Sequence, residues 1–212
     1  MLTNKESIIS AKNALPGRSS PIQIEPIHFV NQSDLFAPLA ANQQVILLGM
    51  GCFWGAERLF WQQSGIISTS VGYSGGYTPN PTYDEVCSGL TGHTEVVRVV
   101  FDQKITTLEQ ILSLFWEKHN PTQGMRQGND LGSQYRSAIY TYSEQQQAIA
   151  EQSKQTYQHV LNQEKTGTIS TEILTAGPYY FAETYHQQYL AKNPNGYCGL
   201  SGTGVCFPVP DE

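Results

Sequence analysis

A short apolar run followed at once by a glycine-flanked cysteine constrains this 212-residue chain more than any other stretch. The run Val45–Met50 is β-branched and aliphatic and too short for a helix, so it predicts a buried strand. The segment after it is expected to be helical, because Phe53, Ala56 and Phe60 recur at helical spacing. Cys52 is therefore expected at the junction between a strand and a helix.

This junction is a favourable place for a reactive sulfur. Unpaired N–H groups and the helix dipole favour negative charge, so we expect a lowered thiol pKa and a thiolate at Cys52. Gly51 and Gly55 leave room for another molecule, and Phe53 and Trp54 are expected to form an aromatic wall. The alternatives are a buried structural cysteine and ordinary core packing of the two aromatic residues.

Composition and charge argue against several kinds of partner. The net charge is −6 and Lys and Arg do not cluster, which argues against nucleic acid and anionic membranes. No apolar stretch approaches the ~20 residues that span a bilayer. Residues 1–10 lack an apolar signal core, so we expect a cytoplasmic protein, and we expect a monomer. In a reducing compartment, the four cysteines favour catalysis or metal binding over structural disulfides.

Three regions follow from the distribution of residue types. Residues 1–42 are polar and interrupted by prolines, which predicts an arm that drapes over the domain or is partly disordered, without chemistry of its own. Residues 43–192 are expected to form a catalytic α+β domain. Residues 193–212 form a glycine-rich tail that carries two of the cysteines.

Hydrophobic periodicity predicts the order of elements in the domain. Further strands are expected at 66–73, 94–102, 137–142 and 168–174, and further helices at 108–116, 143–162 and 182–190. Thr106 and Glu109 form a candidate capping box, and long loops are expected at 74–92 and 122–136. The order as far as residue 142 is that of a split βαβ plait. We therefore predict a two-layer α+β plait with a mainly antiparallel mixed sheet, helices packed on it, and irregular arms at both ends.

Glu95 is the candidate acid. Alternation along its strand places it on one face with Val97, Val99 and Phe101. A carboxyl group held against apolar surface has a raised pKa and stays protonated near neutral pH. Beside a reactive cysteine it would act as a general acid. The alternative is a glutamate at the strand end that reaches solvent.

The two cysteines of the tail suit thiol–disulfide exchange. Cys198 and Cys206 bracket a segment with three glycines, which lets one sulfur reach another and then move away. The alternatives are two unreactive thiols, or a zinc site that would need four ligands in a sequence without C-x-x-C.

Weaker candidates lie in or after the two long loops. Tyr83, Asp130 and Tyr135 carry groups that can bind a polar substrate, with loop packing as the alternative for each. His186 is expected to be a surface histidine or a core histidine with its ring satisfied. Cys87 is expected to be an inert, partly buried thiol.

Four blocks of the sequence resemble the peptide methionine sulfoxide reductase A family, and their combination is highly specific. They are Gly51-Cys52-Phe53-Trp54-Gly55, Gly92-His93-Thr94-Glu95-Val96-Val97, Gly128-Asn129-Asp130-Leu131-Gly132-Ser133-Gln134-Tyr135-Arg136, and Gly196-Tyr197-Cys198-Gly199 with Cys206. The resemblance extends from about Val45 to Cys206 and leaves the N-terminal arm outside the matching blocks. It implies an α+β plait with the cysteine at the start of the first helix.

The resemblance also implies roles around the reacting sulfur. The family's nucleophile corresponds to Cys52 and its acid to Glu95. Its aromatic pocket for the substrate methyl group corresponds to Phe53 and Trp54.

Five more residues receive roles from the resemblance alone. The oxygen-binding hydroxyls correspond to Tyr83 and Tyr135, and Asp130 supports that polar side of the pocket. Cys198 corresponds to the first resolving cysteine and Cys206 to the second, which recycles the enzyme.

The resemblance thus implies an enzyme that reduces methionine S-sulfoxide, protein-bound and free, through a Cys52 sulfenic acid and successive disulfides. Thioredoxin is the implied reductant, and no metal or organic cofactor is needed. Reductases of the A and B types divide the two sulfoxide epimers between them. The other hypotheses are a different cysteine enzyme, such as a thiol peroxidase, and a non-enzymatic zinc or redox-sensing module.

Overall fold

The computed structural model describes residues 5–208, and these residues form eight strands and five α-helices. The strands are β1 Gln43–Met50, β2 Ile66–Ser74, β3 Thr94–Asp102, β4 Arg126–Gln127, β5 Asp130–Leu131, β6 Ser137–Thr141, β7 Glu172–Thr175 and β8 Tyr180–Phe181. The helices are α1 Phe53–Trp61, α2 Tyr83–Cys87, α3 Leu108–Lys118, α4 Glu144–Glu164 and α5 Tyr189–Lys192. Two 3-10 turns, η1 Ala11–Asn13 and η2 Ser133–Tyr135, complete the described elements.

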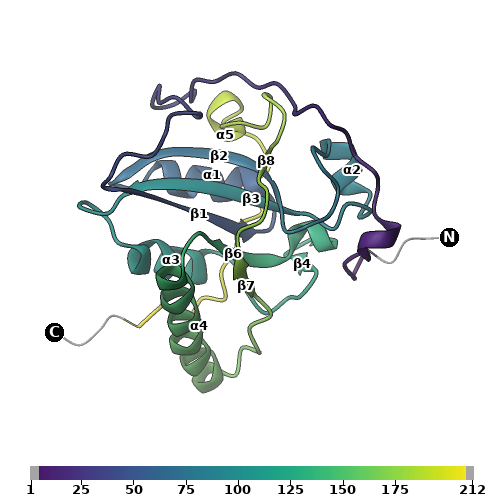
Figure 1. Cartoon of the computed structure of the whole chain (residues 1–212). Coiled ribbons are helices and arrows are strands. Elements are labelled where there is room, and N and C mark those ends of the chain that lie inside the picture. The colour runs from purple at the N-terminus through teal and green to yellow at the C-terminus, as the bar shows by residue number, and fades with distance from the viewer. Residues whose placement is uncertain (1–4, 209–212) are drawn as a thin grey trace.

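The predicted α+β plait is confirmed. The main sheet has the order β7-β6-β1-β3-β2-β8, and its inner strands β6, β1, β3 and β2 pair with one another in antiparallel. Strand β7 adds to β6 in parallel, and β8 adds to β2 in antiparallel (Figure 1). The remaining two strands, β4 and β5, pair with each other in the second long loop.

The helices bury one face of this sheet. Phe53 and Phe60 of α1 share a core with Val97 and Val99 of β3, and buried side chains of α3 and α4 join the same core. On the opposite face, Leu47 of β1 packs in a smaller buried cluster. Both faces of β1 are therefore covered, which explains why its sequence is a continuous apolar run rather than an alternating one.

The first three strands and the first helix lie where the sequence predicts them. Helix α3 also begins at the predicted residue, and only its capping box differs from the prediction. Its capping box is formed by Thr107 and Gln110, one residue later than the predicted pair Thr106 and Glu109. The long loops also contain short elements that were not predicted: α2 in the first, and β4, β5 and η2 in the second. These elements are too short to give a periodic sequence signal.

Two predictions near the C-terminus of the domain need correction. The strand expected at 168–174 is found at Glu172–Thr175, because the backbone N–H groups of Ile169 and Ser170 bond outside the sheet, to Gln158 and Pro121. The helix expected at 182–190 is limited to Tyr189–Lys192.

The segment before that last helix is tied to β2 by a side chain. The amide of Gln187 bonds both the N–H and the carbonyl of Val71, at 2.9 and 2.8 Å, which holds this stretch of chain out of a helix.

Residues 5–42 of the N-terminal arm run over the domain mostly without regular structure (Figure 1). Residues 1–4 of the expected arm and 209–212 of the expected tail lie outside the described residues. None of the helices in the described part of the chain is long and apolar enough to cross a membrane.

Candidate functional site

The sulfur of Cys52 lies where β1 gives way to α1. Gly51 turns the chain with a φ of +84°, and a Cβ there would lie 2.5 Å from the side chain of Gln127. Cys52 is then the N-cap of α1 and is partly buried. The buried strand and the close approach at Gly51 therefore fix the position of the sulfur.

Glu95 lies within reach of this junction. One of its carboxylate oxygens accepts a 3.0 Å hydrogen bond from the backbone N–H of Phe53, the residue after Cys52. The side chain is 1% exposed, and burial raises its pKa to about 8, against the effect of the Phe53 bond. The predicted burial on the apolar face and the raised pKa are both confirmed, so the carboxyl group is protonated at neutral pH.

The expected lowering of the Cys52 pKa is wrong. Burial raises the pKa of the thiol, and the carboxylates of Glu95 and Asp130, where ionised, raise it further. The backbone N–H of Trp54 acts in the opposite direction but does not dominate. Desolvation of the partly buried thiol thus outweighs the helix N-terminus, from which the lowered pKa was expected.

Two phenol groups face the same acid. Tyr83 begins α2 and Tyr135 ends η2, and burial, followed by the ionised form of Glu95, raises the pKa of both. Both phenols therefore stay protonated and can donate hydrogen bonds. Cys87 lies beside the Tyr83 hydroxyl, and burial raises the pKa of its thiol.

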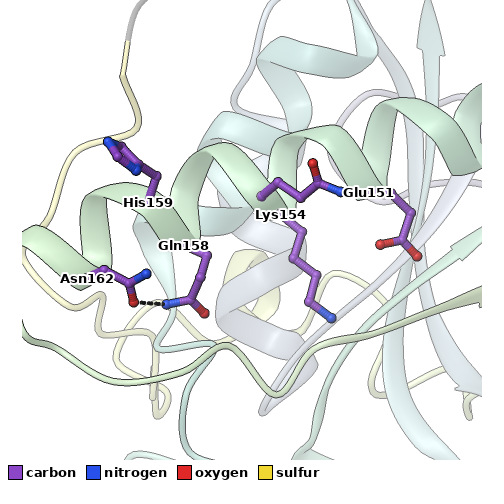
Figure 2. A pocket seen from close by; sticks show the side chains of 6 residues that line it. Glu151, Lys154, Gln158, His159 and Asn162 are labelled. Atoms are coloured by element: carbon purple, nitrogen blue, oxygen red, sulfur yellow. Dashed lines mark hydrogen bonds between the residues drawn. The ribbon is translucent and has the colours of Figure 1, made fainter.

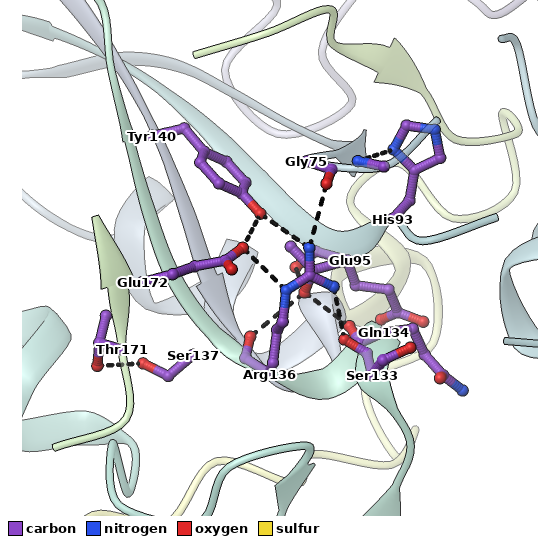
Figure 3. Close-up of polar contacts among 12 residues, drawn as sticks. Gly75, His93, Glu95, Ser133, Gln134, Arg136, Ser137, Tyr140, Thr171 and Glu172 are labelled. Atoms are coloured by element: carbon purple, nitrogen blue, oxygen red, sulfur yellow. Dashed lines mark hydrogen bonds and ion pairs between the residues drawn. The ribbon is translucent and has the colours of Figure 1, made fainter. Parts of the chain in front are cut away.

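A buried arginine anchors the loop of Tyr135 from inside. Arg136 donates to Glu172 Oε1 at 2.8 Å and to the carbonyl of Ser133, the first residue of η2, at 2.8 Å. Its second terminal nitrogen contacts the Tyr140 hydroxyl at 3.2 Å (Figure 3). The short loop that ends at Tyr135 is thus fixed to the strands β6 and β7.

The aromatic side of the site is held by residues that sequence reasoning undervalued or missed. Trp54 Nε1 donates to Nδ1 of His186 at 3.0 Å, and the Trp54 ring stacks on Tyr189 with centroids 3.9 Å apart. The ring of His186 also packs against Phe53 and, at 4.4 Å, against Tyr83. The aromatic and hydroxyl sides of the site therefore meet at this histidine.

His186 is buried, as one of the two expectations had it, but its ring is only half satisfied. Burial lowers its pKa to about 4, so the ring is neutral. Since Nδ1 accepts from Trp54, the proton lies on Nε2, which has no hydrogen-bond partner among the described residues.

Glu57 fixes the turn between His186 and Tyr189. Its carboxylate accepts bonds from the backbone N–H and the side-chain amide of Gln188 at 2.7 and 2.8 Å. Gln188 has a left-handed φ of 49°, and this pair of bonds holds it there. The sequence contained one signal for this role that was not used: Glu57 is a charged residue three positions after Trp54, and it lies on the buried side of α1.

The tail brings Cys198 to α1. A Cβ at Gly55 would lie 2.8 Å from Cys198 Sγ, so this sulfur rests on the first turn of the helix that Cys52 caps. Asp130, which lies close enough to raise the pKa of both Cys52 and Glu95, also accepts a 3.3 Å bond from the Tyr197 hydroxyl. Asp130 therefore links the polar side of the site to the start of the tail.

Cys206 lies elsewhere. The Tyr157 hydroxyl of α4 bonds the carbonyl of Val205 at 2.9 Å, and Glu117 of α3 accepts from the N–H of Phe207 at 2.8 Å. All four cysteines lie in the described part of the chain, and all are free thiols. The structure thus brings Cys198 to the Cys52 helix and holds Cys206 against two other helices.

A hollow on the outer face of α4 has no relation to these residues. It has a volume of about 440 Å³ and is lined by Glu151, Lys154, Gln155, Gln158, His159 and Asn162 (Figure 2). None of the residues predicted for the chemistry lines it. Within residues 5–208, no three His, Cys, Asp or Glu side chains are grouped so that they could hold a metal ion.

Comparisons with known proteins agree with one another. Residues 44–204 match the protein family described as peptide methionine sulfoxide reductase. A "Peptide methionine sulfoxide reductase MsrA" of Vibrio parahaemolyticus is 72% identical over 207 residues, which cover 98% of each chain.

Solved structures give the same result. Methionine sulfoxide reductase A of Corynebacterium diphtheriae has a TM-score of 0.85 at 45% identity, covering 97% of this chain and all of that one. Reduced Mxr1 of Saccharomyces cerevisiae has a TM-score of 0.69 at 32% identity, covering 79% and 94%. A structure of Mxr1 in complex with Trx2 is 19% identical to this chain with a TM-score of 0.51, which bears on the fold alone.

Proposed function

The chain belongs to the peptide methionine sulfoxide reductase A family and is an enzyme that reduces methionine sulfoxide, and we propose that it works through Cys52 with Glu95 as proton donor. One observation carries the proposal: a fully buried carboxyl group, protonated at neutral pH, bonds the backbone N–H next to the cysteine. This arrangement suits an oxygen atom that must be protonated while a sulfur atom is attacked.

The first step transfers oxygen to the enzyme. Glu95 protonates the sulfoxide oxygen while Cys52 Sγ attacks the sulfoxide sulfur. Methionine leaves, Cys52 becomes a sulfenic acid, and the net change is thiol plus sulfoxide to sulfenic acid plus thioether. The raised pKa keeps Cys52 a thiol until substrate binds. The partly positive sulfur of a bound sulfoxide then favours the thiolate that attacks it.

The proposed substrate site has a side of hydroxyl groups and a side of aromatic rings. Tyr83 and Tyr135 bind the sulfoxide oxygen through their protonated hydroxyls, and Asp130 supports this polar side. Phe53 and Trp54 contact the methyl group. A sulfoxide sulfur is a stereocentre, so fixed positions for oxygen and methyl group select one epimer, which we propose is the S epimer.

The tail then removes the oxygen. The thiol of Cys198 condenses with the sulfenic acid and releases water, which leaves a disulfide between Cys52 and Cys198. Cys206 attacks Cys198, freeing Cys52, and the exposed Cys198–Cys206 disulfide accepts two electrons from the dithiol of thioredoxin. Both protein-bound and free methionine sulfoxide are proposed as substrates.

A time course with separated sulfoxide epimers tests the proposal, using thioredoxin, thioredoxin reductase and NADPH for recycling. We expect the S epimer to be consumed as free amino acid and within a peptide, and the R epimer to persist. Reduction of the R epimer, or hydrogen peroxide consumed faster than sulfoxide, would contradict it.

A further inference from the structure

We propose that the N-terminal arm is part of the catalytic apparatus, and that Arg18 is a positioning residue which sets the Tyr83 hydroxyl through Glu85. The family match begins only at residue 44, so the arm lies outside it. The inference rests on the proposed role of Tyr83 in binding the sulfoxide oxygen. The sequence analysis expected the arm to carry no chemistry, and the proposal gives it an indirect part in the reaction.

The position of Tyr83 depends on contacts outside its own helix, because that helix is too short to be stable alone. Helix α2 has five residues, and Tyr83 is the first of them. An isolated helix of this length is unstable in water. A capping box between Thr82 and Glu85 orders its first turn.

Arg18 of the arm binds the glutamate of this capping box directly. Arg18 forms two parallel bonds with the Glu85 carboxylate, at 2.8 and 3.0 Å, and also bonds the carbonyl of Asn80 at 2.6 Å. The same carboxylate accepts the backbone N–H of Thr82 at 2.9 Å, on the residue before Tyr83. Most surface ion pairs contribute little to stability, but a bidentate arginine–carboxylate pair within a network is the favourable case.

Backbone contacts hold the arm in place on both sides of α2. The N–H of Leu15 bonds the carbonyl of Leu90 at 2.9 Å, and the N–H of Arg18 bonds the carbonyl of Pro79 at 3.1 Å. Between them, Gly17 has a φ of +65°, and a Cβ there would lie 2.2 Å from the Pro79 carbonyl oxygen. The arm thus bridges the two ends of the loop that carries Tyr83.

A second contact of the arm reaches both hydroxyl-bearing loops. The amino group of Lys5 bonds the carbonyl of Cys87, at the end of α2, at 2.9 Å. The carbonyl of Lys5 accepts the N–H of Ser133, the first residue of η2, at 2.8 Å. The loop of Tyr135 has its own internal anchor in Arg136, so the effect of the arm should be concentrated on Tyr83.

The test uses the full chain and measures methionine formed in a single turnover of the S-sulfoxide. We expect Arg18→Ala to lower the rate constant at saturating substrate about three- to tenfold, with a smaller change in the substrate concentration for half-saturation. Glu85→Gln keeps the oxygen that caps α2 but loses the ion pair, and it should lower the rate constant by the same factor as Arg18→Ala. Lys12→Ala, an exposed charge change on the same arm, is the control and should leave the rate unchanged.

A double-mutant cycle identifies the route of the effect. In a Tyr83→Phe background we expect Arg18→Ala to lower the rate less than twofold further, because the group that it positions is already absent. An equal loss in both backgrounds, or no loss from Arg18→Ala in the native background, would overturn the inference while leaving the proposed function intact. If Tyr83→Phe alone leaves the rate unchanged, the proposed role of Tyr83 fails and the inference fails with it.

Discussion

The reacting centre and the C-terminal tail of this enzyme are built in opposite ways. Cys52 and Glu95 are held by a buried strand, a close approach at Gly51 and a hydrogen bond that the Phe53 N–H of α1 donates to Glu95. Cys198 and Cys206 are exposed and lie on a glycine-rich chain without regular structure, which is held by hydrogen bonds to α3, α4 and Asp130 and by packing of Leu200, Val205 and Phe207 against the core.

The difference follows from what each region must do. Proton transfer to a sulfoxide needs a desolvated acid in a fixed position, and the buried face of β3 provides one in Glu95. Disulfide exchange needs sulfurs that meet one partner and then another, which requires an accessible and movable chain. Each region can therefore be damaged in a way that leaves the other working.

The largest effect should come from removing the nucleophile. We expect Cys52→Ser to abolish methionine formation altogether, including the first turnover, since a serine hydroxyl has no comparable nucleophilicity near neutral pH. Single-turnover assays measure this, with Cys87→Ser as the matched cysteine control that keeps turning over. Methionine formation by the Cys52 variant would show that Cys52 is not the nucleophile, and the division between the reacting centre and the tail would then be wrong.

Removing the first cysteine of the tail should separate the regions instead. We expect Cys198→Ser to form about one equivalent of methionine at the native rate and then to stall with thioredoxin, because only the resolving step is lost. The burst amplitude and the steady-state rate are the two measurements. Continued turnover at the native rate would show that Cys52 is recycled without the tail.

Replacing the acid Glu95 should slow the reaction at the reacting centre and leave the chemistry of the tail unchanged. We expect Glu95→Ala to slow the first turnover about 10²- to 10³-fold and Glu95→Gln to slow it much less, because the amide still donates a hydrogen bond to oxygen. Resolution by Cys198 should be unchanged in both variants. Equal and negligible losses would remove Glu95 from the mechanism.

The pH profile gives a second reading of the same residue. The pKa of Glu95 is about 8, so its protonated form is complete well below pH 8 and is lost as the pH rises through that value. We expect the single-turnover rate to fall above pH 8 in the native enzyme and to lack this limb in Glu95→Gln. A native rate that stays flat from pH 7 to 9 would contradict the assignment.

The contrast also explains what could be read from the sequence. The two-residue period of β3 places Glu95 on one face with Val97, Val99 and Phe101, but both faces of this strand are buried, and only the structure decides between an inward Glu95 and one that reaches solvent. The Cys52 pKa could not be predicted either, because its direction depends on how deeply the tertiary structure buries the cap. The resemblance to a known family supplied roles, but not burial.

Contacts between distant segments were the part that the sequence could not give. Tyr189 stacks on Trp54 only because Glu57 and Gln188, far apart in the chain, hold the turn between them. The helix predicted at 182–190 was wrong for the same reason, since side-chain bonds to β2 outweigh local periodicity there. Irregular segments of this kind have no period to detect.

The smallest expected effect concerns the docking of Cys206. Tyr157→Phe keeps the buried ring and removes the hydroxyl that bonds Val205 and Thr203. One net hydrogen bond is worth about 0.5–1.5 kcal/mol, so the undocked tail should become more populated and transfer of the disulfide from Cys52 to Cys206 about two- to twelvefold faster. Quenched-flow trapping of the thiols released after one turnover measures it, with Tyr142→Phe as the control. An unchanged transfer rate would mean that the tail leaves α4 freely, and a changed first-turnover rate would mean that the reacting centre and the tail are coupled.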